Sequence, residues 1–214
     1  MLVVVPSFIL LLIIDKYPFV IDLLESSRAT PWGAFTSIFV HNGFRNDFAP
    51  NAVFMALFVS LFVVTNLGVA PDLRRSRSRF FFYATFLSAI IANLTYIIFI
   101  PNPSFGASGA GYACEGVMLA FSLTNTLSLA STFRLLVNPI YSSERERLIL
   151  ASLMNPLIFA LFIYWLVTNP ESFLAVAPNI AVLAHGVGFY LAFLSTIVYH
   201  FLKERRQIYQ NPQR

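Results

Sequence analysis

Residues 106–120 read GASGAGYACEGVMLA, and they are the most informative part of the sequence for the fold. Small residues recur there at spacings of four, three and four, which places them on one ridge of a helix: Gly109, Ala113, Gly116 and Ala120. Such a ridge lets another helix backbone approach closely inside a membrane. Ser108, Tyr112 and Glu115 follow at i, i+4 and i+7 and form a polar stripe beside the ridge. We therefore expect a membrane helix over residues 107–130 that packs tightly against a second helix.

Residues 179–202 have the same character and supply the second helix of that pair. A histidine there shares one helix face with small residues, in the set Ala181, His185, Gly188 and Ala192. Close packing of the two faces is expected to bring Ser108 and His185 within reach of each other.

The composition of the whole chain is that of a polytopic membrane protein. Hydrophobic residues make up 57% of its 214 residues and charged residues 11%, and the mean hydropathy is +0.72. A soluble domain carries about 25% charged residues, so a soluble globule of this size could not cover its surface. The content of Phe, Leu, Ile and Val excludes disorder, and the single cysteine, Cys114, excludes a disulfide scaffold. The small net charge of +4 argues against nucleic acid as a partner.

Six segments are long and apolar enough, or nearly so, to cross the hydrocarbon, which takes about 20 residues. They are residues 2–22, 51–70, 80–100, 107–130, 148–168 and 179–202. The first is the weakest, because Pro6, Asp15, Lys16 and Pro18 interrupt it, and a shorter span ending near Ile14 is the alternative. We expect an all-α, six-helix bundle that forms a single domain over residues 1–214.

The basic residues set the expected orientation of this bundle. Eleven of the 14 lie in three regions: the short loop 71–79, the turn that carries Arg134, Arg145 and Arg147, and the tail from Lys203 to Arg214. With six spans these regions fall on one side, which the positive-inside rule assigns, with both termini, to the cytoplasm. The opposite side carries the long connection 23–50, and loops of that length are usually functional. We expect a multi-pass protein of the plasma membrane, with the lipid bilayer as a partner.

A serine beside a histidine inside a membrane indicates nucleophilic chemistry. Serine attacks poorly unless a base takes its proton, and histidine is the usual base near neutral pH. No acidic residue is placed to orient His185, so a Ser108–His185 dyad is the simpler hypothesis than a triad. The alternative for each residue alone is structural, since serines and histidines inside membranes also serve as hydrogen-bonding groups between helices.

These motifs resemble the rhomboid intramembrane serine proteases. The resemblance is carried by Gly106-Ala107-Ser108-Gly109 at the start of the fourth span and by Ala184-His185 with Gly188 in the sixth. The long first loop, with Trp32 and the run Thr36 to His41, is similar to the run that precedes the second span in that family. The resemblance extends over most of the chain.

The resemblance implies a role for each matching residue. Ser108 would be the nucleophile, His185 the general base, and Tyr112 the ring that stacks on the histidine. Asn51 and the backbone N–H of Ser108 would stabilise the oxyanion, and Gly106 and His41 would support the site.

The sequence also departs from the family pattern at several positions. The family often has a second histidine four residues before the asparagine, where this chain has Asp47, and Gly33 follows Trp32 where the family has arginine. The family's second sixth-span glycine is Ala192 here, and Glu115 is unexpected. An anionic Asp47 would repel an oxyanion, so it is not assigned that role.

The function expected from this resemblance is serine-type endopeptidase activity on transmembrane segments of other membrane proteins, with no metal and no cofactor. The first alternative is a catalytically inactive rhomboid-like protein that binds transmembrane helices, which Asp47 and Gly33 favour. The second is a small proton-coupled transporter that uses Glu115 and His185 as a relay. Against it, the sequence shows no inverted repeat. The oligomeric state is left open.

Overall fold

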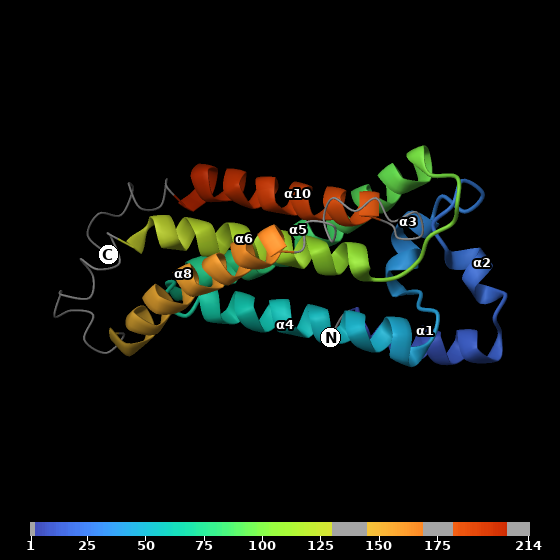
Figure 1. Cartoon of the computed structure of the whole chain (residues 1–214), viewed down its shortest axis with the longest axis horizontal. Helices are drawn as coiled ribbons and strands as arrows, with labels where there is room; N and C mark the ends of the chain where they lie inside the picture. Colours follow the sequence, from blue (N-terminus) through green and yellow to red (C-terminus); the bar gives the residue numbers. More distant parts are fainter. Residues whose placement is uncertain (1–2, 130–144, 169–181, 205–214) are drawn as a thin grey trace.

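A computed structural model describes residues 3–129, 145–168 and 182–204, and the regular elements in these ranges are helices (Figure 1). The longer helices are α1 (Val4–Lys16), α4 (Ala49–Thr65), α5 (Pro71–Phe99), α6 (Ser108–Leu127), α8 (Arg145–Thr168) and α10 (Val182–Tyr199). The shorter ones are α2 (Val20–Leu24), α3 (Gly33–Thr36), the 3-10 turn η1 (Ser37–Phe39) and the π-helical turns η2 (Phe44–Phe48) and η4 (His200–Glu204). The predicted all-α class agrees with this architecture.

Four helical segments within the described ranges are long and apolar enough to cross a membrane, where the sequence predicts six. They are Phe44–Thr65, Pro71–Phe99, Arg145–Thr168 and Val182–Lys203. α6 has sufficient length at 20 residues, but small and polar residues replace large apolar ones along it. α1 has 13 residues and spans about 20 Å at 1.5 Å per residue, well short of the hydrocarbon thickness.

α6 is the central helix of the bundle and packs against α4, α5, α8 and α10 (Figure 1). Its small residues are fully buried: Ala113 and Ala120 have no exposed surface, and a Cβ added to Gly116 would lie 2.4 Å from the carbonyl oxygen of Phe189 on α10. The facing contact is equally close, since a Cβ on Gly188 would lie 2.9 Å from the carbonyl oxygen of Gly109. The predicted close packing of the two small-residue faces is confirmed, except at Ala181, which lies outside the described residues.

The outer faces of the surrounding helices are apolar and exposed. Large hydrophobic side chains project from them with more than half of their surface uncovered, among them Val53, Leu57, Leu87, Leu161 and Leu194. Soluble monomers rarely expose so much contiguous apolar surface, whereas lipid solvates it.

Two predicted boundaries are wrong. The segment 2–22 is not one helix, because the chain leaves α1 after Lys16 and resumes as the short α2; Pro18 cannot continue the hydrogen-bonding pattern of α1. The basic segment 71–79 is not a loop but the first turns of α5. Pro71 is favourable at the start of a helix, because the N–H that proline lacks would have no partner in the first turn. Asp72 is favourable there because its carboxylate lies at the positive end of the helix dipole.

Other boundaries shift by smaller amounts. The second predicted span, 51–70, appears as α4, which starts two residues earlier at Ala49 and ends at Thr65. Within the predicted loop 23–50 the chain forms the short elements α3, η1 and η2. Residues 130, 179–181 and the tail beyond 204, including Arg205, Arg206 and Arg214, lie outside the described residues, as does Arg134.

Arg77 is buried in the bundle rather than at a surface, at 3% exposure. Its Nη1 donates to the Oδ1 atoms of Asn66 and Asn125, each at 3.0 Å, and its guanidinium lies 4.7 Å from the ring centroid of Phe121. Asn125 in turn donates to Oδ1 of Asn155 at 3.1 Å. This polar network joins α5, α6 and α8 to the end of α4.

Replacing Arg77 with methionine is expected to destabilise the fold, because the amide oxygens of Asn66 and Asn125 would lose a charged donor inside a buried site. Hydrogen bonds to charged groups contribute about 1.5–3 kcal/mol, and the loss should fall in that range. Thermal unfolding in detergent measures it, with exposed Arg45→Met as the matched control. Equal melting temperatures for the two variants would contradict a structural role for the network.

Candidate active site

The chain enters α6 through a tight turn at Gly106. Gly106 has a φ of +112°, which a residue with a side chain rarely adopts, and its N–H donates to the carbonyl oxygen of Ser37 at 3.0 Å. A short antiparallel bridge between Ser26 and Ser104 fixes the preceding residues against the first loop. These contacts hold the start of α6 against the first loop.

Ser108 is the first residue of α6 and is partly exposed. The N–H groups of the first helical turn have no partner within the helix, and the helix dipole is positive there. A negative charge that develops beside Ser108 would therefore be stabilised by the helix end itself.

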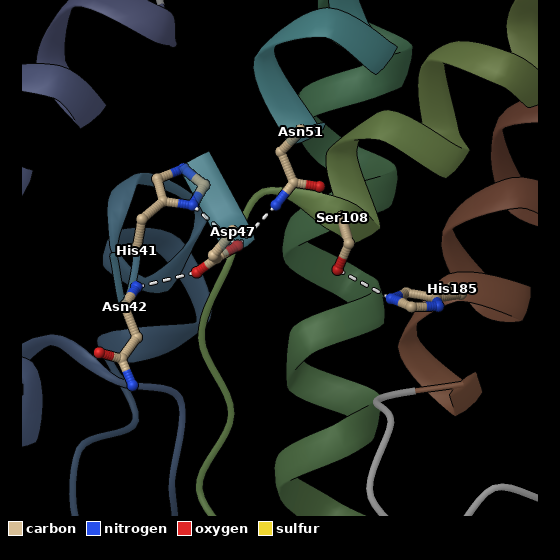
Figure 2. Close-up of polar contacts among 6 residues, drawn as sticks. All are labelled: His41, Asn42, Asp47, Asn51, Ser108 and His185. Atoms are coloured by element: carbon tan, nitrogen blue, oxygen red, sulfur yellow. Dashed lines mark hydrogen bonds and ion pairs between the residues drawn. The ribbon is translucent and has the colours of Figure 1, made fainter. Parts of the chain in front are cut away.

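His185 reaches Ser108 from the first turn of α10. Its Nε2 lies 2.8 Å from Ser108 Oγ, a hydrogen-bonding distance, and the imidazole is 7% exposed (Figure 2). The ring of Tyr112 stacks on the imidazole with centroids 4.4 Å apart and planes at 20°. Ser108 and His185 are 77 positions apart in sequence, and the close packing of α6 against α10 brings them together.

No carboxylate of the described ranges forms an ion pair with His185. Stacking against Tyr112 and the hydrogen bond to Ser108 are the contacts that orient the ring. Within the described ranges, the geometry is that of a Ser–His pair with no acidic third member. The described residues likewise bring together no cluster of three metal-ligating side chains.

Asn51, in the first turn of α4, lies near Ser108, but its amide is held by Asp47. Asn51 Nδ2 donates to Asp47 Oδ1 at 2.7 Å, while Asp47 Oδ2 accepts from the backbone N–H of Asn42 at 2.9 Å (Figure 2). His41 Nδ1 lies 3.1 Å from the same Oδ1 atom. Four predicted positions therefore fall into two groups: Ser108 with His185, and Asn51 with His41 through Asp47.

Asp47 is the residue of this site whose contacts sequence reasoning missed. From the sequence, Asp47 is a departure from the family pattern; in the structure its carboxylate connects the first loop to α4. The i, i+4 spacing of Asp47 and Asn51 in consecutive helical turns is the signal from which their bond could have been predicted. A Cβ at Gly106 would lie 3.6 Å from Asp47 Oδ1, so the carboxylate also sits close to the turn that leads into α6.

Glu115 continues the polar stripe one turn beyond Tyr112 and is buried, with 1% of its surface exposed. Neither carboxyl oxygen has a hydrogen-bond partner among the described residues. A buried polar group without a partner is costly to fold, which marks Glu115 as a destabilising residue.

Replacing Glu115 with methionine, which is apolar and of similar length, is expected to raise stability by about 1–3 kcal/mol, the desolvation cost of an unpaired buried group. Leu119→Met, one turn further along α6 and 4% exposed, is the matched control and should change stability by less than about 1.5 kcal/mol. Thermal unfolding in detergent compares the two. A lower melting temperature for Glu115→Met would show that the carboxyl group has a stabilising partner.

A comparison of the chain with models of protein families found a match. The family model for the Rhomboid domain matches residues 28–201. This range runs from the first loop into η4, just past the end of α10, and includes Asn51, Ser108, Tyr112 and His185. No curated protein and no solved structure matched the chain. The apolar outer surface and the four candidate spans fit an integral, multi-pass membrane protein. The resemblance stated from the motifs is thus confirmed over most of the sequence, and the chain belongs to the rhomboid family.

Proposed function

We propose that this protein is an intramembrane serine endopeptidase that cleaves transmembrane segments of other membrane proteins. The observation that carries the proposal is the 2.8 Å contact between Ser108 Oγ and His185 Nε2, with Tyr112 stacked on the imidazole. Rhomboid family membership supports it independently of the contact.

The reaction follows the acyl-enzyme scheme of serine hydrolases. His185 Nε2 takes the proton of Ser108 Oγ as that oxygen attacks the scissile carbonyl, and it later delivers the proton to the leaving amine. A water molecule, deprotonated by the same imidazole, then hydrolyses the acyl-serine ester and releases the second fragment. No step of this scheme requires a metal ion or an organic cofactor.

The oxyanion of the tetrahedral intermediate would form at the start of α6. The backbone N–H of Ser108 points out of the helix there, and the side chain of Asn51 supplies a second donor. Asn51 Nδ2 carries two hydrogens, of which one is donated to Asp47. In this proposal the other hydrogen would be donated to the substrate, and Asp47 would restrain the amide that carries it.

The substrate must expose a carbonyl that its own helix would otherwise hold in a hydrogen bond. Small or helix-breaking residues lower the cost of unwinding a transmembrane segment, so we expect cleavage near such residues. We further propose six spans in a single domain, with α6 and the segment 2–22, which contains the short α1, as the two beyond the four apolar ones. A span shorter than the hydrocarbon is accommodated by local thinning of the bilayer. We propose both termini in the cytoplasm and the plasma membrane as the location. Ser108 then opens to the noncytoplasmic side.

A second candidate function is helix binding without catalysis. The observation that favours it is the bond between Asn51 and Asp47, since it draws an oxyanion donor toward an anion. The two functions differ in whether Ser108 is activated, which a chemical probe reports directly.

Labelling by a fluorophosphonate probe therefore tests the proposal. The serine oxygen displaces fluoride from phosphorus only if a base takes its proton, so the wild type should be labelled and both Ser108→Ala and His185→Ala should not. Folding of each variant is checked by its melting temperature. A folded wild type that resists the probe would favour the binding function over the enzyme.

A further inference from the structure

A cavity lies at the opposite end of the bundle from Ser108, between the first turns of α5 and the end of α10. It has a volume of about 440 Å3. Its lining combines three cations with three aromatic rings: Arg75, Arg79, Lys203, Phe80, Tyr83 and Tyr199. We refer to these six residues as the α5–α10 basic pocket. The proposed protease activity uses none of them.

The pocket is built from matching faces of two helices. On α5 the lining positions recur at spacings of three and four, so Arg75, Arg79 and Tyr83 share one face. Tyr199 is fixed between the helices, since its hydroxyl lies 2.8 Å from Ser76 Oγ and its ring stacks on Phe80 with centroids 4.2 Å apart. The stacked rings of Tyr199 and Phe80 therefore form a fixed aromatic surface, and the cations lie around it.

The cations of the pocket are available to a ligand. Arg75, Arg79 and Lys203 are exposed, and no ion pair with any of them occurs in the part of the chain that the structure describes. Lys203 Nζ lies over the ring of Tyr199, 5.6 Å from its centroid, so this charge faces the aromatic surface. The one carboxylate of the lining, Asp72, lies in the first turn of α5, where the helix dipole offsets its charge. The pocket is thus suited to an anion.

The length of α5 places the pocket at the level of lipid headgroups. Its 29 residues extend over about 43 Å, against about 30 Å of hydrocarbon. Residues 71–79, which carry the charges of α5, lie at one end of the helix. Charged side chains are costly in lipid, so this end forms the part of α5 that extends beyond the hydrocarbon. Tyr83 follows them and is 62% exposed, the arrangement of an aromatic residue at the boundary between headgroups and chains.

We propose that the α5–α10 basic pocket binds the phosphate headgroup of an anionic phospholipid. The planar guanidinium groups of Arg75 and Arg79 match phosphate oxygens in pairs, and Lys203 adds a third charge. A lipid is favoured over a soluble phosphate because the exposed Tyr83 continues the pocket toward the apolar face that carries Leu87. An occupied pocket would bridge α5 and α10, the helix that carries His185.

The test is lipid retention by the intact chain. The protein is purified in neutral detergent, mixed with phosphatidylglycerol or phosphatidylcholine, and examined by native mass spectrometry. The variant is Arg75→Gln with Arg79→Gln. The charge-matched control is Lys16→Gln with Arg45→Gln, two exposed cations outside the pocket.

The wild type and the control should retain phosphatidylglycerol, while the pocket variant should bind it about 25-fold more weakly, from about fivefold for each cation removed. Phosphatidylglycerol should also raise the melting temperature of the wild type and the control, but not that of the pocket variant. Phosphatidylcholine should be retained weakly and equally by all three proteins.

Three results would overturn the proposal. An equal loss of phosphatidylglycerol in the variant and the control would mean diffuse attraction to net charge. Equal retention of the two lipids would mean that the headgroup charge is not recognised. Binding of inorganic phosphate that depends on Arg75 and Arg79, without retention of phosphatidylglycerol, would assign the pocket to a soluble anion instead.

Discussion

Replacing Ser108 with alanine is expected to reduce the rate of peptide-bond cleavage by about 10⁴-fold or more, the usual cost of removing a serine nucleophile. Alanine leaves His185 without an oxygen to activate. The fold should be retained, because Ser108 is partly exposed at the start of a helix and alanine is a good helix former. The measurement is cleavage of a tagged transmembrane substrate in liposomes, with Ser60→Ala as the control for removing a serine hydroxyl.

Ser60 is a suitable control because it is exposed on α4 and, among the described residues, its hydroxyl bonds within its own helix, to the carbonyl oxygen of Ala56. His185→Ala should lose cleavage to a similar extent, and the double variant should be no worse than either single one, since the two residues act as a unit. Undiminished cleavage by Ser108→Ala would refute the assignment of the nucleophile.

Replacing Gly116 with alanine is expected to damage both stability and cleavage. The added methyl group would lie 2.4 Å from the carbonyl oxygen of Phe189, and that backbone can only move with α10. Overpacking of this kind costs about 1–3 kcal/mol, and a rigid backbone neighbour places the effect at the upper end. A shift of α10 also moves His185 relative to Ser108, and a misplacement of about 1 Å can cost about 10²-fold in rate.

Gly109→Ala is the matched control for stability. Among the described residues, the nearest atom to its added Cβ would be Asn93 Oδ1 at 3.8 Å, an ordinary contact. Its melting temperature should equal or exceed that of the wild type, since alanine favours a helix over glycine by about 1 kcal/mol. Melting curves in detergent compare the two variants. Equal stability of Gly116→Ala and Gly109→Ala would contradict the close approach of α6 and α10.

The central pair of helices could be predicted from the sequence because its signals are local and periodic. Glycine and alanine at helical spacing allow two helices to pack closely. That packing restricts where the polar side chains beside the small residues can lie. Ser108, Tyr112 and His185 therefore lie together as expected. The resemblance to the rhomboid family then implied a role in catalysis for these three residues together.

Residues whose roles depend on distant partners could not be predicted in this way. Arg77 looks like one more basic residue of a topology signal, yet it is buried against two asparagines from other parts of the chain. Asn93 is a polar residue within the predicted span 80–100, yet it donates to the carbonyl oxygen of Ala34 and to Ser37 Oγ in the first-loop region. Only the folded chain brings such partners together.

The distance of 77 positions in sequence from Ser108 to His185 has a consequence for biosynthesis. The nucleophile is made well before the base, and at about 5–20 residues per second the interval is roughly 4–15 s. During that time the nascent chain carries an unactivated serine among other newly inserted segments, including those of neighbouring proteins. We therefore expect the proposed proteolytic activity to begin only when α10 docks against α6, so that unfinished or truncated chains are harmless to the membrane in which they are made.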